Sequence, residues 1–348
     1  MLTKQLQDSG IVTKARAIKA HILKDSDYEK IINMSSVSEV LAFLKEKEGY
    51  KELFRELDTN SSRGKIEHEL SYMLQITYAK LYRFASKKQR NTIRIYFYRF
   101  EIYVIKICLQ RILRVEEEEV DFSLSLDFFR KHSEIDLEQI LAAKTIEGLL
   151  EVLKKTSYYS VIYDVYNLVD PSLFDYETRL DIFNYKRLWK MKDDVLKGSE
   201  RRAFEEVFGR EIDLLNLSWI YRFKTAFDTD TGKILKSIIP IHYKLSKKQV
   251  SNMIMSENIM ELNELIHKCP YQNLFPDDMI RKEDVETCER RYVERIYRKY
   301  AKKNAYSIIP ILYLLRLKEH EIDKLTTAIE CIRYKLPVEH SREILENF

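Results

Sequence analysis

Apolar side chains recur at helical spacing along most of the chain. In the segment that begins at Glu101, they stand at Ile102, Ile105, Leu109 and Ile112, at offsets of three, seven and ten from the first. This spacing places the four side chains on one face of an α-helix. Because similar patterns occur in many other segments, we expect an all-α fold in which each helix buries one face.

The glutamate-led segment occurs three times. Glu101-Ile-Tyr-Val-Ile, Glu211-Ile-Asp-Leu-Leu and Glu321-Ile-Asp-Lys-Leu follow one another at a separation of 110 residues. In the middle copy the apolar pattern is interrupted at Arg222, which predicts that the last turn of that helix is solvated or paired. Recurrence at a fixed long period is the signature of a repeated structural unit.

Helix-capping pairs repeat with the same period. In each pair a short polar side chain precedes an acid or amide by three residues, and the pairs begin at Ser26, Asp136 and Ser246. Each pair lies 75 residues before its glutamate-led helix. A second helix start follows in each copy, at Ser36, Thr145 and Asn258. The shared period of these signals indicates triplication of one structural unit.

The repeat predicts the domain organisation. Three tandem homologous helical units of about 110 residues span 1–115, 116–227 and 228–348. Three like units joined head to tail form an open solenoid, or close into a ring when the rotation completes. We expect closure into a pseudo-threefold funnel with an axial cavity, which suits an elongated partner.

Composition supports long elements and excludes several function classes. Glycine and proline number only 7 and 6 among 348 residues, about a third of their usual combined share. The glycines never fall into the spacing of a phosphate-binding loop. Lys and Arg total 59 against 55 Asp and Glu, so the near-neutral balance does not indicate a strongly polyanionic partner.

Cysteine spacing and hydropathy exclude several structural features. The four cysteines stand far apart without a C-x-x-C motif, which argues against zinc and against a disulfide framework. The longest apolar run, Tyr306 to Leu315, is about half as long as a bilayer-spanning helix requires. The N-terminal residues contain no uninterrupted hydrophobic stretch. We therefore expect neither a secretory signal nor a segment that crosses a membrane.

The sequence carries no recognised catalytic pattern. None of the seven histidines falls into a known metal-binding or catalytic spacing, and no G-x-S-x-G motif is present. Basic and aromatic residues alternate within 87–99 and 291–303, as on some nucleic-acid-binding surfaces. Glu294 stands in helical register with Arg298, which favours a solvated helix face instead. We expect no catalytic residue, cofactor, metal, small-molecule substrate or nucleic-acid partner.

Two stretches carry a resemblance to a known family. The run from Tyr313 through His320-Glu-Ile-Asp-Lys-Leu325 to Pro337 resembles the closing helix of the C subunit of the archaeal and bacterial rotary V-type (A-type) ATPases. The eukaryotic counterpart is the d subunit. Residues 15–23, 27–28 and 34–41 resemble the opening of the same family, and the likeness extends from about residue 13 to 345. Lys335 stands where the family often carries glycine, which affects only a local turn.

The resemblance implies a function without chemistry. It implies a non-catalytic, funnel-shaped central-stalk subunit, peripheral on the cytoplasmic face of the membrane. Its partners would be the rotor-shaft subunits of the soluble ATPase sector and the membrane proteolipid ring, between which it would transmit torque for ion transport. On physical grounds alone, two other functions remain open: a helical-repeat RNA-binding protein and a helical scaffold in some other assembly.

Overall fold

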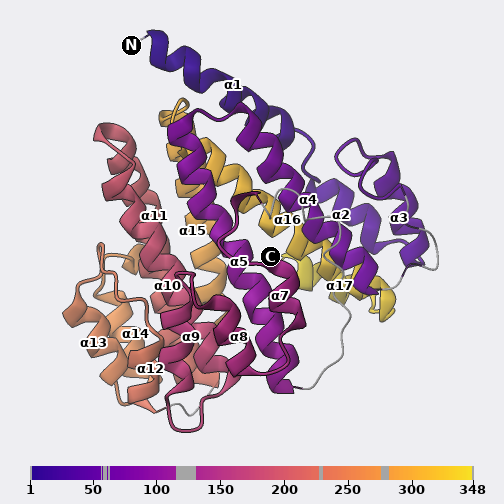
Figure 1. Cartoon of the computed structure of the whole chain (residues 1–348). Coiled ribbons are helices and arrows are strands. Elements are labelled where there is room, and N and C mark those ends of the chain that lie inside the picture. Colours follow the sequence, from indigo (N-terminus) through magenta and orange to yellow (C-terminus); the bar gives the residue numbers. More distant parts are fainter. Residues whose placement is uncertain are drawn as a thin grey trace. The chain divides into compact units, whose positions relative to one another are not determined.

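The protein is all-helical, as the apolar spacing predicts (Figure 1). The computed structural model describes residues 2–55, 57, 61, 63–114, 131–226, 230–275 and 282–346, and no strand occurs among them. The helices of the first third are α1 (Leu2–Lys19), α2 (Asp25–Ile32), α3 (Val37–Glu46), α4 (Arg63–Phe84) and α5 (Lys87–Arg114). The central helices are α7 (Leu137–Ala142), α8 (Ile146–Leu153), α9 (Tyr159–Tyr166), α10 (Leu173–Asp194) and α11 (Gly198–Ala226). The remaining elements are α12 (Thr231–Ser237), α13 (Lys247–Met255), α14 (Ile259–His267), the 3₁₀ turn η2 (Gln272–Leu274), α15 (Lys282–Lys303), α16 (Ile309–Arg333) and α17 (Val338–Glu346).

The chain forms two compact units. The first compact unit comprises Met1–Ile93, Glu118–Lys131 and Asn304–Phe348, and the second comprises Arg94–Glu117 and His132–Lys303. Both ends of the chain therefore belong to the first unit. The boundaries that the repeat predicts, at 115/116 and 227/228, fall outside the described residues. The threefold division stays a prediction.

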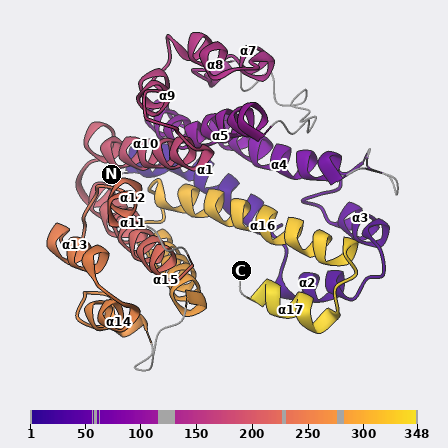
Figure 2. The same cartoon turned by 90° about the horizontal axis from the view of Figure 1, so that it is seen from below.

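In the first compact unit, α16 is the central helix. It packs against α1, α4, α2, α3 and α17, and Figures 1 and 2 show it alongside α4 and α2. Leu325 and Ile329 of α16 share a core with Ile31 of α2 and Leu44 of α3, and all four side chains are buried. These positions follow the apolar spacing of the sequence. Helix α16, from the C-terminal part of the chain, thus completes the hydrophobic core of the N-terminal helices α2 and α3.

A residue in the left-handed conformation, Lys335, follows the C-terminal end of helix α16. Lys335 has a φ of 53°, the Lys335 N–H donates to the Ile332 carbonyl, and the Leu336 N–H donates to the Cys331 carbonyl. These two bonds form the motif that glycine most often closes, because a side chain at positive φ is strained. This local turn therefore forms with lysine in the strained position, where the resemblance noted in the sequence leads us to expect glycine.

The second compact unit is organised around two long helices. Helix α11 packs against α15 and α10, while α9 packs against α10 (Figure 2). A close approach is made possible by Gly209 of α11, where an added Cβ would lie 2.5 Å from Cγ of Tyr243. The short helices begin at caps the sequence predicts, because the side chains of Thr145 and Asn258 accept hydrogen bonds from Gly148 N–H and Glu261 N–H. Ser36 caps α3 of the first compact unit in the same way.

Candidate functional site

The first repeat marker, Glu101 of α5, is a fully buried carboxylate. Its Oε1 accepts from the Glu134 N–H at 2.8 Å, and its Oε2 accepts from the Tyr158 hydroxyl at 2.6 Å. Burial raises the pKa of Glu101, although these hydrogen bonds act in the opposite direction. The carboxylate therefore fixes α5 to the segments on both sides of the short helices α7 and α8.

Arg187 of α10 extends this cluster. It donates to Oε1 of Glu134 at 2.5 Å and lies 3.3 Å from the ring centre of Tyr98. Burial alone would raise the pKa of Glu134, but the hydrogen bond from Ser157 and the positive charge of Arg187 outweigh it and lower the pKa. Glu101 and Glu134 are linked by the hydrogen bond from the Glu134 N–H to the Glu101 carboxylate. The pKa of Glu101 is nevertheless raised, whereas that of Glu134 is lowered.

The third marker, Glu321 of α16, forms the equivalent contact in the first compact unit. Its Oε1 accepts from the Leu23 N–H at 2.6 Å, and its Oε2 pairs with Nζ of Lys318 at 2.6 Å. The Lys318 side chain is only 3% exposed and lies 5.6 Å from the ring centre of Tyr50. Burial, reinforced by the charge of Glu321, raises the pKa of Tyr50 well above its ordinary value.

In the middle copy, two residues of α11 form the corresponding contacts. Glu211 accepts from the Tyr297 hydroxyl at 2.7 Å, which joins α11 to α15. Asp213, two residues later, accepts from the Tyr271 hydroxyl at 2.9 Å and from three consecutive backbone N–H groups, those of residues 243–245. Sequence reasoning missed Asp213, although the Glu-Ile-Asp string that contains it is repeated at residues 321–323.

The three clusters share one geometry. Glu321, Glu101 and Asp213 each accept from backbone N–H groups that lie just before a short helix, namely before α2, α7 and α13. Each long helix therefore holds short helices that come from the next sequence copy, and α16 of the last copy holds those of the first. We call these three contacts the carboxylate latches.

The capping markers lie at two of the three expected positions. Asp136 and Ser246 accept from the backbone N–H of Gln139 and Gln249. Ser26 is not a cap, because α2 begins at Asp25 and the Asp27 carboxylate accepts from the Lys24 N–H. A carboxylate attracts the N-terminal N–H groups of a helix more strongly than a hydroxyl does, which moves the start of α2 toward the N-terminus.

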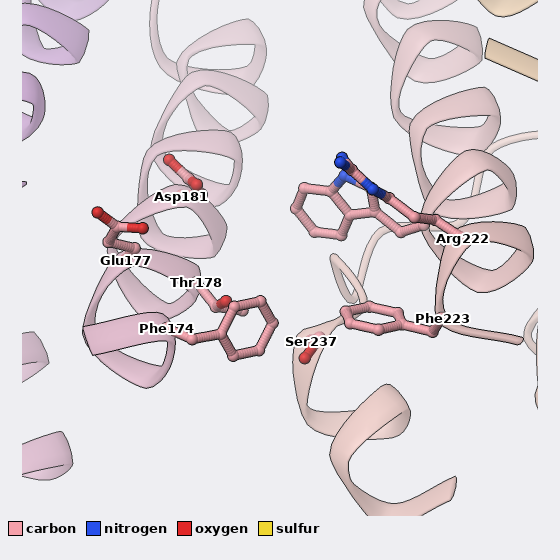
Figure 3. Close-up of a pocket in the computed structure, with 8 residues that line it drawn as sticks. Phe174, Glu177, Thr178, Asp181, Arg222, Phe223 and Ser237 are labelled. Atoms are coloured by element: carbon pink, nitrogen blue, oxygen red, sulfur yellow. The ribbon is translucent and has the colours of Figure 1, made fainter. Parts of the chain in front are cut away.

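A cavity of about 310 Å³ lies in the second compact unit, and none of its lining residues belongs to a latch (Figure 3). One wall is a face of α10, since Phe174, Glu177, Thr178 and Asp181 follow at helical spacing and all line it. The sequence shows that these four residues share one face of a helix. It does not show that this face lines a cavity, because the opposite wall comes from other helices.

The opposite wall comes from α11 and α12. Trp219, Arg222 and Phe223 of α11 line the cavity, together with Ser237 at the end of α12. The rings of Phe174 and Phe223 meet edge to face, with centres 5.9 Å apart. Arg222 is the residue at which the apolar pattern of the middle copy is interrupted, so the sequence contained the signal for this wall.

The charged groups of the cavity are unequally paired. Nζ of Lys106 contacts both carboxylate oxygens of Asp181 at 2.7 Å, and Nε2 of Gln110 donates to Oε1 of Glu177 at 2.8 Å. Arg222, on the opposite wall, is exposed and forms no hydrogen bond or ion pair with any residue that the structure describes. Among the described residues, this aromatic cavity thus presents a cation, Arg222, without an anionic partner and an anion, Glu177, that is held only by a neutral amide.

The described part of the chain holds no cluster of metal ligands. Within those ranges, no three or more His, Cys, Asp or Glu side chains gather in a way that could hold a metal ion. Nor is any helix in those ranges long and apolar enough to cross a membrane.

Comparison with known proteins gives one consistent result. The model of the ATP synthase (C/AC39) subunit family matches residues 11–344. The A-type ATP synthase C subunit of Methanosarcina mazei is 27% identical over 318 residues, which cover 90% of this chain and 86% of that protein. The A-type ATP synthase C subunit of Archaeoglobus fulgidus is 25% identical over 94% of this chain and 93% of its own length. The resemblance found in the sequence is thereby confirmed: the chain belongs to the ATP synthase (C/AC39) subunit family.

Proposed function

We propose that this chain is the non-catalytic central-stalk connector of a rotary A-type or V-type ATPase. The proposal is carried by the match of the family model to residues 11–344, together with relatives named as the C subunit of A-type ATP synthase that align over most of both chains. A rotary ATPase needs a part that joins the shaft of its soluble sector to its membrane proteolipid ring. We assign that part to this chain, as a peripheral subunit on the cytoplasmic side.

A connector of this kind must resist twisting. Torque applied at one end is transmitted only if the helices do not slide or separate, and close-packed interiors transmit strain. The carboxylate latches support this role, because each fixes a long helix to a neighbouring short-helix cluster through charge-assisted hydrogen bonds inside the core. The scarcity of glycine and proline favours the same stiffness.

We further propose that the three sequence copies close into a pseudo-threefold funnel. The latches support this arrangement through their connectivity, since each copy holds the next and the last holds the first. The funnel would receive the shaft in its axial opening and rest on the ring with its other end. The chain itself would carry out no reaction and bind no cofactor.

The experiment is reconstitution of coupled transport. The proteolipid ring, the stalk and the ATP-hydrolysing sector are assembled in vesicles with and without this chain, and ATP-driven ion uptake is measured beside ATP hydrolysis. We expect hydrolysis to persist and ion uptake to be lost when the chain is omitted. Undiminished uptake in its absence would show that another component makes the connection.

A latch variant refines this test. Glu321→Gln is added at a temperature where it remains folded, with Glu346→Gln on the exposed surface of α17 as the matched control. We expect fewer ions transported per ATP with Glu321→Gln, because a loosened α16 yields under torque, and an unchanged ratio with the control. Equal ratios for both variants would exclude the Glu321 latch from torque transmission.

A further inference from the structure

The cavity between α10 and α11 has the features of a ligand site. It combines aromatic walls with an exposed arginine, and its volume of about 310 Å³ lies at the lower end of the range for small-molecule and side-chain pockets. None of these residues takes part in a carboxylate latch. Their chemistry defines what could be bound.

The hydrogen-bond donors of the cavity are suited to binding a carboxylate group of a ligand. Arg222 offers five N–H groups in a planar fork and has no partner among the described residues, and the indole N–H of Trp219 is likewise without one there. A guanidinium pairs best with a planar carboxylate, through two parallel hydrogen bonds. Asp181 does not fill this role from across the cavity, because Lys106 already holds both of its oxygens.

The acceptors call for an N–H group beside the carboxylate. Oε1 of Glu177 receives Gln110, which leaves its Oε2 without a donor in the described part of the chain. The edge-to-face pair of Phe174 and Phe223 provides an apolar surface next to these polar groups. A ligand that satisfies all three features has a carboxylate, a neighbouring N–H and an apolar side chain.

We propose that this cavity captures the C-terminal residue of a protein partner, an apolar residue with its free carboxylate. Such a residue carries the three groups on one carbon atom. Its carboxylate pairs with Arg222, its backbone N–H donates to Glu177, and its side chain packs on the aromatic walls. A mid-chain acidic residue fits less well, because its chain must leave the cavity in two directions.

The first experiment uses Trp219 as the reporter. The chain has 2 tryptophans, so Trp189→Phe leaves Trp219 as the only one. The probe is N-acetylphenylalanine, and the matched control is its amide, which lacks only the carboxylate. We expect a saturable change in emission with a Kd on the order of 1 mM for a fragment of this size, and binding of the amide at least about tenfold weaker. Equal binding of acid and amide, or no saturable change, would overturn the proposal.

Variants of the unsubstituted chain locate the contact and do not depend on the folding of Trp189→Phe. Ligand-observed NMR with the same probe is applied to Arg222→Gln and to Arg202→Gln, which removes an exposed positive charge near the other end of α11. We expect binding to weaken at least about tenfold in the first variant only. Equal weakening in both would mean nonspecific attraction to positive charge.

Peptides decide whether the occupant is a protein end. A hexapeptide that ends in phenylalanine with a free carboxylate should bind at least as tightly as the small probe, and the same peptide with a C-terminal amide should not. If the small probe binds and the hexapeptide is excluded, the cavity takes a small carboxylate and the assignment to a protein partner is wrong. These assays use the isolated chain, so their outcome is independent of the connector role.

Discussion

The Leu23 N–H donates to Oε1 of Glu321 across 2.6 Å, although 298 residues separate them in the sequence. The bond lies in the core and fixes the segment before α2 to the centre of α16. Oε2 of the same carboxylate holds Lys318, whose ammonium is enclosed with it. One side chain thus joins the beginning of the chain to its end and neutralises a buried cation.

Glu321→Gln is expected to destabilise the protein strongly. The substitution leaves the buried ammonium of Lys318 without its anion, and removal of one partner from a buried ion pair costs about 3–5 kcal/mol. Denaturant unfolding followed by circular dichroism measures the loss. The double variant Lys318→Met/Glu321→Gln removes both charges and should recover part of it. A loss below about 1 kcal/mol for the single variant would contradict the description of this latch.

Asp213→Asn is expected to weaken the middle latch. Asn offers one acceptor oxygen in place of two and turns an N–H₂ group toward backbone donors, so several of the bonds from residues 243–245 and Tyr271 are lost. We expect a loss of about 3 kcal/mol or more in the free energy of unfolding. Asp323→Asn is the control, since Asp323 occupies the same repeat position but is exposed. Equal losses at both positions would contradict the special role of Asp213.

The latch at Glu101 is expected to make stability depend on pH. Burial raises the pKa of Glu101 above 4.5, so the folded chain binds this proton more tightly than the unfolded chain does. The stability that this carboxyl contributes is therefore fully present below about pH 4.5 and is lost as the pH rises through the raised pKa. Relative to Glu101→Gln, which does not titrate, the wild type should lose stability from about pH 4.5 toward neutrality.

Glu134→Gln supplies the control of opposite sign. The pKa of Glu134 is lowered below 4.5, so its contribution is present above that pH and is lost as the pH falls through the lowered value. Urea unfolding of the wild type and both variants, at a series of pH values, gives the two differences. Differences of the same sign, or two flat lines, would show that the environments of these carboxyl groups are not as described.

Lys335→Gly is expected to stabilise the protein by about 0.5–1 kcal/mol. A left-handed conformation costs a side-chain-bearing residue about 1–2 kcal/mol, and the greater entropy of glycine in the unfolded chain offsets part of the gain. Tyr334→Gly is the matched control, because Tyr334 has a φ of −84° and gains nothing from glycine. The melting temperature and the denaturant midpoint should therefore rise for Lys335→Gly and fall for Tyr334→Gly.

The repeat of 110 residues located much of the structure. Helix starts at Ser36, Thr145 and Asn258 follow from the sequence because capping is local: a side chain reaches an N–H three residues away. The all-α class follows from apolar spacing for the same reason. At Ser26 the local rule failed, because two acids flank that serine and the pattern alone does not rank them.

The latches could be predicted only as positions, not as contacts. The period marked Glu101 and Glu321, but a buried glutamate and an exposed one look alike in a helical pattern. The partners of both carboxylates are backbone N–H groups far away along the chain, and a backbone N–H has no sequence signature. The shift from Glu211 to Asp213 depends on how close α11 lies to residues 243–245, which the tertiary packing decides.

The composition of the first compact unit sets the order in which the protein can mature during synthesis. Its N-terminal helices leave the ribosome early, yet Leu325 and Ile329, which complete their core, are made after residues 94–303. At about 5–20 residues per second, this delay is roughly 10–40 s. Throughout it, the apolar faces around Ile31 and Leu44 remain available to chaperones, while the second unit gains all its segments first. A chain that is released after residue 303 therefore holds every segment of the second unit, while the core of the first unit lacks Leu325 and Ile329.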